Sequence, residues 1–212
     1  MRRNSGRLAV AALVTVLVLV GGGLWWWQRP SGSADVPASA CWGLVTAGDL
    51  RTLMDNTGKA SEEAPITPTD LSGLAAKADC KVSREPRESP PLVQIMVDQL
   101  DEASYRAALD HETERAGAGK NAVLDFGVGV DGWRQETFSL YLLLRCDNGR
   151  PARPGTIYRE IYLWGTNFSV DPASLERTQL YVDIAHRTAR EIVRQEGCPD
   201  VRIGERAPVV AG

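Results

Sequence analysis

Residues 92–109, LVQIMVDQLDEASYRAAL, combine two hydrophobic patterns that decide the fold. The first nine residues largely alternate between apolar and polar side chains, which is typical of a half-buried β-strand. Asp101 then precedes Tyr105, Ala108 and Leu109, whose spacing indicates one apolar face of a helix that the aspartate caps. The sequence therefore predicts a strand followed directly by a helix.

Further elements extend outward from this unit. Strands are expected at residues 79–83, 138–146 and 157–164, and the sequence DNG at residues 147–149 is typical of a hairpin turn. The glycine-rich residues 127–132 are expected to form a loop. This order of elements predicts an α+β fold, in which helices cover one face of a mainly antiparallel sheet.

Two more helices are predicted at the two ends of the folded part. Thr46 and Asp49 have the spacing of a capping box and open a short helix. Asp171 and Pro172 open the last helix. The acidic, proline-containing residues 61–74 are expected to be a loop. The apolar stripe expected in the last helix is Leu180, Ile184, Ala185, Thr188, Ala189 and Ile192.

The composition is that of a globular chain with an acidic main part. Hydrophobic residues make up 43% and charged residues 24%, which excludes disordered and collagen-like chains. The first 30 residues hold four arginines and no acidic residue, which leaves 20 basic and 27 acidic residues and a net charge of −7 in residues 31–212. An acidic domain is repelled by phosphate backbones, so no nucleic-acid partner is expected.

Residues 8–27, LAVAALVTVLVLVGGGLWWW, form an uncharged apolar run of 20 residues. At about 1.5 Å per residue, a helix of this length crosses a hydrocarbon core of roughly 30 Å. The arginines in residues 1–7 favour a cytoplasmic amino terminus, with the rest of the chain outside the cell membrane. Trp25, Trp26 and Trp27 would then lie at the outer membrane interface.

A cleaved signal peptide is the alternative to this anchor. Ala38-Ser39-Ala40 resembles a peptidase site and Cys41 follows it, but the polar residues 28–37 separate this site from the apolar run. We therefore favour an uncleaved anchor. The predicted organisation is a cytoplasmic tail at 1–7, a transmembrane signal anchor at 8–27, a flexible linker at 28–40, an extracytoplasmic α+β domain at 41–200 and a disordered tail at 201–212.

Four cysteines, Cys41, Cys80, Cys146 and Cys198, follow the anchor, and none of them forms a C-x-x-C pair. Outside the cytoplasm an even number of cysteines predicts two disulfides. Three pairings are possible. We favour Cys41 with Cys80, because this pair brackets the first helical unit, and Cys146 with Cys198, because this pair ties a strand end to the end of the last helix.

Several segments together resemble a known family. They are CWGLVTAGDLRTLM at Cys41, DCKVS around Cys80, VQIMVDQLDEASYRAAL, FGVGVDGW and the closing helix before Cys198. In spacing they are similar to actinobacterial secreted or lipid-anchored envelope proteins of unknown function that have a PsbP-like α/β sandwich domain. The resemblance implies this fold and an envelope location without assigned catalytic residues. The chain departs from the family in lacking a proper lipobox before Cys41 and in carrying the extra pair Cys146 and Cys198.

The motifs that resemble cofactor or metal sites do not have the required context. Residues 127–132, GVGVDG, match the dinucleotide fingerprint, but a strand follows where the fingerprint needs a helix. His111 and His186 are expected on solvated helix faces. His111, Glu112 and Glu114 lack the paired histidines of a zinc helix. We therefore expect no cofactor and no metal.

The acidic residues Asp98, Asp101 and Glu102 cluster where the strand of residues 92–100 meets the following helix. Paired carboxylates can perform acid–base chemistry, so a cell-wall or glycan hydrolase is one hypothesis. Helix capping uses the same residue types more often. Serines and cysteines occur in no nucleophile motif, so catalysis is not the favoured function.

The strand of residues 157–164 places Tyr158, Tyr162 and Trp164 on one side. Tyr and Trp are enriched at protein interfaces, so these rings could dock a partner if the helices cover the opposite face. The alternative is that they pack under the last helix. The favoured function is a membrane-anchored envelope module that binds another envelope or secretion-linked protein, and a small-ligand or lipid carrier is a further alternative.

Overall fold

The structure is a computed structural model, and it describes residues 34–63, 77–86, 90–135, 139–148, 155–165 and 175–210. The predicted basic tail at 1–7, the anchor at 8–27 and Trp25, Trp26 and Trp27 lie outside the described residues. Within the described ranges, no helix has both the length and the apolar character needed to span a membrane. The elements are β1 (Ser39–Ala40), β2 (Val45–Thr46), α2 (Ala47–Leu53), β3 (Lys59–Glu63), β4 (Lys77–Glu85), β5 (Val93–Leu100), α3 (Glu102–Gly117), β6 (Asn121–Asp125), β7 (Gly127–Val128), β8 (Val130–Gln135), β9 (Ser139–Asn148), β10 (Gly155–Trp164), α4 (Leu175–Glu196) and β11 (Arg202–Ile203).

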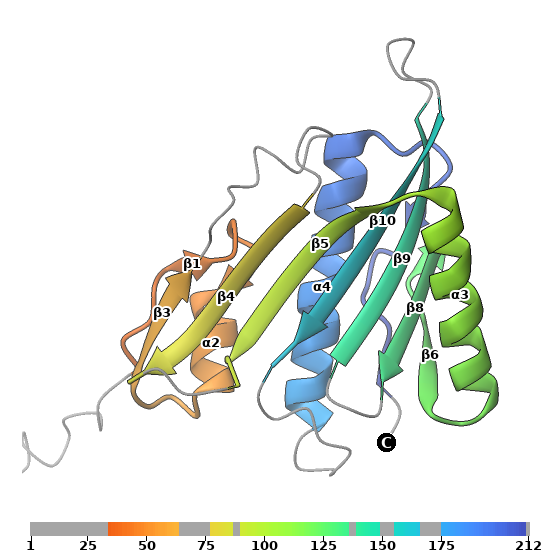
Figure 1. The fold of residues 1–212 in the computed structure, drawn as a ribbon. Helices are drawn as coiled ribbons and strands as arrows, with labels where there is room; N and C mark the ends of the chain where they lie inside the picture. Colours follow the sequence, from red (N-terminus) through yellow and green to blue (C-terminus); the bar gives the residue numbers. More distant parts are fainter. Residues whose placement is uncertain are drawn as a thin grey trace, which may run out of the picture. The chain divides into compact units, whose positions relative to one another are not determined.

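Seven strands form one sheet in the order β3-β4-β5-β10-β9-β8-β6 (Figure 1). Each neighbouring pair is antiparallel. β10 lies between two partners, and its Ile161 pairs with Val97 of β5 and with Leu142 of β9. The predicted α+β class and mainly antiparallel sheet are therefore confirmed.

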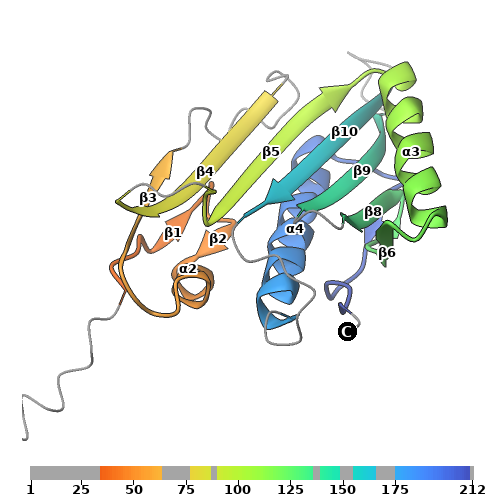
Figure 2. The same ribbon diagram turned by 60° about the horizontal axis from the view of Figure 1, so that its bottom comes forward.

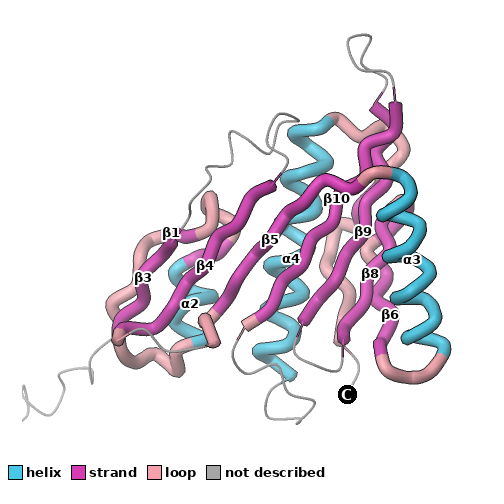
Figure 3. Tube along the Cα trace, viewed as in Figure 1, coloured by secondary structure: helices cyan, strands magenta, loops and turns pink. Residues whose placement is uncertain are grey.

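Helices lie on both faces of this sheet. Figures 2 and 3 show α2 and α4 on one side, which we call the back face, whereas α3 lies on the other side, the front face. On the front, Tyr105 of α3 packs with Leu143 and Tyr158 in a cluster separate from the main core. The prediction that helices cover one face is therefore wrong for α3. Hydrophobic periodicity shows that a helix face is buried, but it does not show which face of the sheet buries it.

The back-face helix α4 has the apolar stripe that the sequence predicts. Leu180 is partly buried and packs against the core, and Gly197, with φ of 68°, follows the helix in the left-handed region. Asp171 and Pro172, the predicted helix start, lie outside the described residues. The fully buried members of the stripe are Ile184, Ala185, Thr188, Ala189 and Ile192.

The edge strand β3 lies partly inside the segment predicted to be an acidic loop. It pairs with β4, which is longer than the predicted strand at 79–83, and Ala60 stands opposite Arg84. Ala60 is the one buried residue of β3, so the sequence of this strand lacks the alternation that predicts a strand. Pairing with β4 accounts for its extended conformation.

The folded part begins before the predicted boundary at residue 41. The backbone N–H of Ala60 donates to the carbonyl of Asp35 at 3.0 Å, and the hairpin of β1 and β2 leads into α2. The predicted capping box of Thr46 and Asp49 opens this helix. Residues 34–40 therefore belong to the fold, so the predicted linker at 28–40 is wrong for them.

Residues 201–210 pack against the domain, so the prediction of a disordered tail is corrected for them. β11 pairs with β7, and the backbone N–H of Val210 donates to Oε1 of Gln179 at 2.9 Å. Val201 is buried, and Ala207 and Val210 pack against the main core. Apolar side chains separated by polar residues hold this segment, which explains why local composition did not indicate it.

Both predicted disulfides are present, Cys41–Cys80 and Cys146–Cys198, and all four cysteines are buried. The first bond connects the β1–β2 hairpin to β4, and the second connects β9 to Cys198, two residues after the end of α4. Two structural disulfides are typical of an oxidising compartment, which supports an extracytoplasmic location for this domain.

Candidate binding surface

The three aromatic residues predicted as a partner face lie on the front of β10, but they differ in exposure. Tyr158 is buried beneath α3, and its ring centroid lies 4.4 Å from that of Tyr105. Tyr162 and Trp164 are partly exposed. The last helix lies on the back face, so the alternative that these rings pack under it is wrong. Only Tyr162 and Trp164 are available for contact with another molecule.

These two rings belong to a larger exposed area. Figure 1 shows α3 at the β8–β6 end of the front face and no described helix in front of β4 and β5. Strand register places further side chains of β4, β5, β9 and β10 on the same face. We call this area the open front surface, and its partly exposed residues are Asp79, Lys81, Gln94, Met96, Asp98, Tyr141, Glu160, Tyr162 and Trp164.

A row of large side chains crosses the strands at the level of Tyr162. Met96, Tyr162, Tyr141 and Trp133 occupy neighbouring register positions on β5, β10, β9 and β8. The ring centroids of Tyr141 and Tyr162 are 6.4 Å apart, and those of Trp133 and Tyr141 are 6.2 Å apart. Trp133 is buried. The row thus begins in a buried cluster and continues onto the open front surface.

Trp164 is held in place by a chain of hydrogen bonds. Its Nε1 donates to Oε1 of Gln94 at 2.9 Å, and Nε2 of Gln94 donates to Oδ1 of Asp79 at 2.9 Å. The polar edge of the indole is therefore satisfied within the protein, while part of its apolar surface faces solvent. A fixed aromatic side chain loses little conformational entropy when it binds a partner.

Tyr141 is kept neutral by its surroundings. Burial, and then the negative charge of Glu160 and a hydrogen bond to it, raise the pKa of the Tyr141 hydroxyl well above its ordinary value. The hydroxyl therefore donates to the Glu160 carboxylate at neutral pH. Glu160 lies two residues before the partly exposed Tyr162, on the same face of β10.

The carboxylate of Glu112 is used in a hydrogen-bond network under α3. Nδ2 of Asn121 donates to Oε2 at 2.5 Å, and Nε2 of Gln135 donates to Oε1 at 3.0 Å. His111 is exposed, and its Nε2 lies 3.9 Å from Oε1 of Glu112. Glu114 is exposed as well. The structure therefore does not bring His111, Glu112 and Glu114 together as metal ligands.

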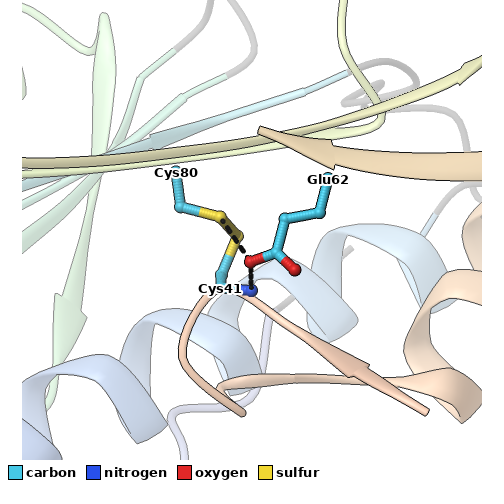
Figure 4. A group of neighbouring side chains, drawn as sticks. All are labelled: Cys41, Glu62 and Cys80. Atoms are coloured by element: carbon cyan, nitrogen blue, oxygen red, sulfur yellow. Dashed lines mark hydrogen bonds between the residues drawn. A yellow bond between two sulfur atoms is a disulfide. The ribbon is translucent and has the colours of Figure 1, made fainter. Parts of the chain in front are cut away.

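The described residues contain one group with metal-ligand geometry, Cys41, Glu62 and Cys80 (Figure 4). Oε1 of Glu62 accepts the backbone N–H of Cys41 at 2.7 Å and lies 3.6 Å from Sγ of Cys80. Both sulfur atoms are joined in the disulfide and buried. A disulfide offers no thiolate to a metal, so this group stabilises the hairpin of β1 and β2 and is not a metal centre.

The acidic cluster at the start of α3 has a structural role. Oδ1 of Asp101 accepts the backbone N–H of Ser104 at 2.7 Å, and this hydrogen bond lowers the pKa of Asp101. Glu102 forms an ion pair with Arg106 at 2.5 Å. A general acid needs a raised pKa, so Asp101 does not fit that role. The geometry of this cluster favours helix capping over hydrolysis.

The glycine-rich segment and His186 meet the carboxyl-terminal residues. Gly127 has φ of 116°, and a Cβ there would collide with the carbonyl of Arg202, so glycine allows β7 and β11 to pair. The strand β8 follows, in the place where a dinucleotide site needs a helix. Nε2 of His186 lies 2.7 Å from the carbonyl oxygen of Gly204. His186 is buried, so the prediction of a solvated helix face is wrong for it.

The chain matches no protein-family model, no curated protein and no solved structure. The resemblance to envelope proteins with a PsbP-like domain therefore stays a prediction. The alternation of β10 predicts Tyr162 and Trp164 and places Glu160 on the same side, but it does not predict Tyr141 or Gln94 as their neighbours. These two residues come from β9 and β5, whose pairing with β10 the sequence left open.

Proposed function

We propose that this protein is a membrane-anchored binding module of the cell envelope. Residues 8–27 serve as its anchor, residues 1–7 stay in the cytoplasm, and the folded domain lies outside the cell membrane. Its partner is another envelope or secretion-linked protein, which docks on the open front surface. The two disulfides support the extracytoplasmic part of this proposal.

The observation that carries the binding role is the fixed, partly exposed pair of Tyr162 and Trp164. Binding energy at interfaces is concentrated in a few Tyr, Trp and Arg residues that lie in ordered surroundings. Trp164 is held through Gln94 and Asp79, and Tyr162 contacts the ring of Tyr141. The same surface supplies aromatic contact area and hydrogen-bonding groups, as the core and rim of a protein interface do.

Site-specific photo-crosslinking in living cells tests this proposal. The full-length chain carries p-benzoylphenylalanine at Tyr162 or at Trp164, and a third version carries it at Val209, which is 84% exposed in the carboxyl-terminal segment. We expect one defined protein adduct from the first two positions and not from Val209. An absence of specific adducts at Tyr162 and Trp164, or the same adducts from all three positions, would contradict the proposal.

A further inference from the structure

The two edges of the seven-stranded sheet are protected to different degrees. Figure 1 shows β3 at one end of the sheet and β6 at the other. β3 carries three charged residues, Lys59, Glu62 and Glu63, and the carbonyl of Asp35 accepts the backbone N–H of Ala60. Charged side chains and a covering segment prevent an edge strand from pairing with other chains. The β3 edge therefore has both kinds of protection.

The edge at β6 has little of this protection. The sequence of β6, NAVLD, contains no lysine or proline, and Asp125 at its end is its one charged residue. Within the described residues β6 pairs with β8 alone. An antiparallel strand directs its N–H and carbonyl groups alternately to its two sides, so pairing with β8 uses only half of them. The other side of β6 has no strand beside it among the described residues.

An exposed apolar side chain lies in the middle of this edge strand. Among the described residues, the large hydrophobic side chains that are exposed are Val123 of β6, Val128 of β7 and Val209, at 69%, 64% and 84%. Val123 stands opposite Trp133, which lies on the front face. α3 covers the front of β6 at the buried Asn121 but leaves Val123 exposed. The middle of β6 thus combines an unprotected backbone edge with an apolar side chain in solvent.

We infer that β6 pairs with β6 of a second copy of this chain, antiparallel and about a twofold axis, so that the two sheets join into one. This inference goes beyond the proposed function, because β6 lies outside the open front surface. Directly opposite residues of an antiparallel pair point to the same face of the sheet. A twofold axis normal to the sheet keeps the two faces, so the register must be centred on a residue. The register centred on Val123 pairs all five residues of β6.

The register centred on Val123 is self-complementary, as a twofold interface requires. It places Val123 opposite Val123 of the second copy, Ala122 opposite Leu124, and Asn121 opposite Asp125. An amide therefore stands opposite a carboxylate, and no two like charges are opposite, whereas a parallel pairing in register would bring the two copies of Asp125 together. The α3 of each copy covers β6 at Asn121, so in the pair it lies next to the Asp125 end of the other β6.

Native mass spectrometry of the purified full-length protein, released from detergent micelles, tests this inference. We expect the unaltered protein to form a dimer. Val123→Lys and Val123→Glu should each raise the dissociation constant of the dimer by about fivefold to tenfold, because each variant removes the valine pair and places like charges opposite one another. A mixture of the two variants, one of them with a mass tag, should recover the dimer as a mixed pair, since lysine then stands opposite glutamate.

Val209→Lys is the matched control, since it adds the same charge at an exposed valine outside β6. The dissociation constant of this variant should stay within about twofold of that of the unaltered protein. A monomeric unaltered protein would overturn the inference. A dimer that persists unchanged in both Val123 variants, or a mixture that recovers no mixed pair, would overturn it as well.

Oxidative crosslinking of the full-length protein in membranes tests the register. Opposite residues of an antiparallel pair have Cβ atoms about 4.5 to 5.5 Å apart, which a small adjustment brings within reach of a disulfide. We expect Val123→Cys to form a covalent dimer. Val128→Cys should not, because Val128 is similarly exposed but the two copies of it lie at opposite ends of the paired strands. Absent dimers from Val123→Cys, or equal dimers from both variants, would overturn the register. Neither result bears on crosslinking from Tyr162 or Trp164, which tests the proposed function separately.

Discussion

Arg159 and Glu196 show what a single buried ion pair contributes to this domain. Arg159 lies on the back of β10 and Glu196 at the end of α4, and their side chains are each 2% exposed. Nη2 of Arg159 donates to Oε1 of Glu196 at 2.5 Å. Loss of one partner would leave the other charge buried without compensation, which costs far more than the pair itself contributes.

We expect Glu196→Ala to lower the free energy of unfolding by about 3 to 5 kcal/mol, measured by urea denaturation. Glu191→Ala is the control, because Glu191 pairs with the largely exposed Arg194 and its loss should cost less than about 1 kcal/mol. Replacement of both buried partners by apolar residues, as in Arg159→Met with Glu196→Leu, should restore most of the stability. Similar effects of Glu196→Ala and Glu191→Ala would contradict this account.

Gly165 is a second position of interest, because the absence of a Cβ there allows close packing. The hydroxyl of Tyr181 on α4 donates to the carbonyl of Leu92 at 2.5 Å, and a Cβ on Gly165 would collide with both groups. We expect Gly165→Ala to lower the free energy of unfolding by about 1 to 3 kcal/mol, measured by urea denaturation. Gly117→Ala, where a Cβ meets no atom within 4 Å, should stay within about 1 kcal/mol of the unaltered protein. Equal free energies of unfolding for Gly165→Ala and Gly117→Ala would contradict the expected collision at Gly165.

At the scale of elements, α3 and its tyrosine make the front of the sheet sensitive to alkaline pH. Burial, and then the charge of Asp131, raise the pKa of Tyr105 from 10.0 to about 12. The folded state therefore holds the phenolic proton more tightly than the unfolded state. The resulting stabilisation is complete below pH 10.0 and is lost as the pH rises toward about 12.

Urea denaturation at a series of pH values across this range measures the effect, and absorbance at 295 nm follows tyrosinate formation. We expect stability to fall over the range, and Tyr105→Phe to show a smaller fall because this position no longer titrates. Tyr141 also has a raised pKa, so the fall in that variant is reduced and not abolished. An equal fall in stability in Tyr105→Phe and in the unaltered protein would contradict a raised pKa of Tyr105.

At the scale of the whole molecule, two covalent bonds connect parts that are distant in sequence. The disulfides close separations of 39 and 52 residues, and by chain entropy each contributes about 4 kcal/mol. We expect Cys146→Ser with Cys198→Ser to lower the free energy of unfolding by about that amount in urea. An unchanged free energy of unfolding would contradict this prediction and show that the packing of α4 on β9 holds the two elements together without the disulfide.

Peptide mapping by mass spectrometry without reduction, on protein taken from the membrane fraction, tests the location of the whole chain. We expect Cys41–Cys80 and Cys146–Cys198 links together with peptides from residues 1–30. Free thiols at all four cysteines would contradict the extracytoplasmic location. A lipid on Cys41 would contradict the transmembrane anchor and show a lipoprotein.

The elements that were predicted correctly from the sequence have patterns that involve residues close together in the chain. The alternation of β5, the stripe of α4 and the capping box of Thr46 each depend on neighbours within a few positions. β3 was missed because only Ala60 is buried in it, and residues 201–210 were missed because their apolar contacts are spaced irregularly. A segment held mainly by distant partners carries little local signal.

By itself, the sequence determined the α+β class and the aromatic side of β10, and it favoured the cysteine pairing that the structure contains. Only the tertiary structure decided the sheet order, the placement of α3 on the front face and the pairing of Tyr162 with Tyr141 and Met96. Hydrophobic periodicity predicts which side of a helix or strand is buried, because apolar side chains recur with the period of that element. It leaves open which strands become neighbours, because register depends on the simultaneous packing of segments that are far apart in the chain.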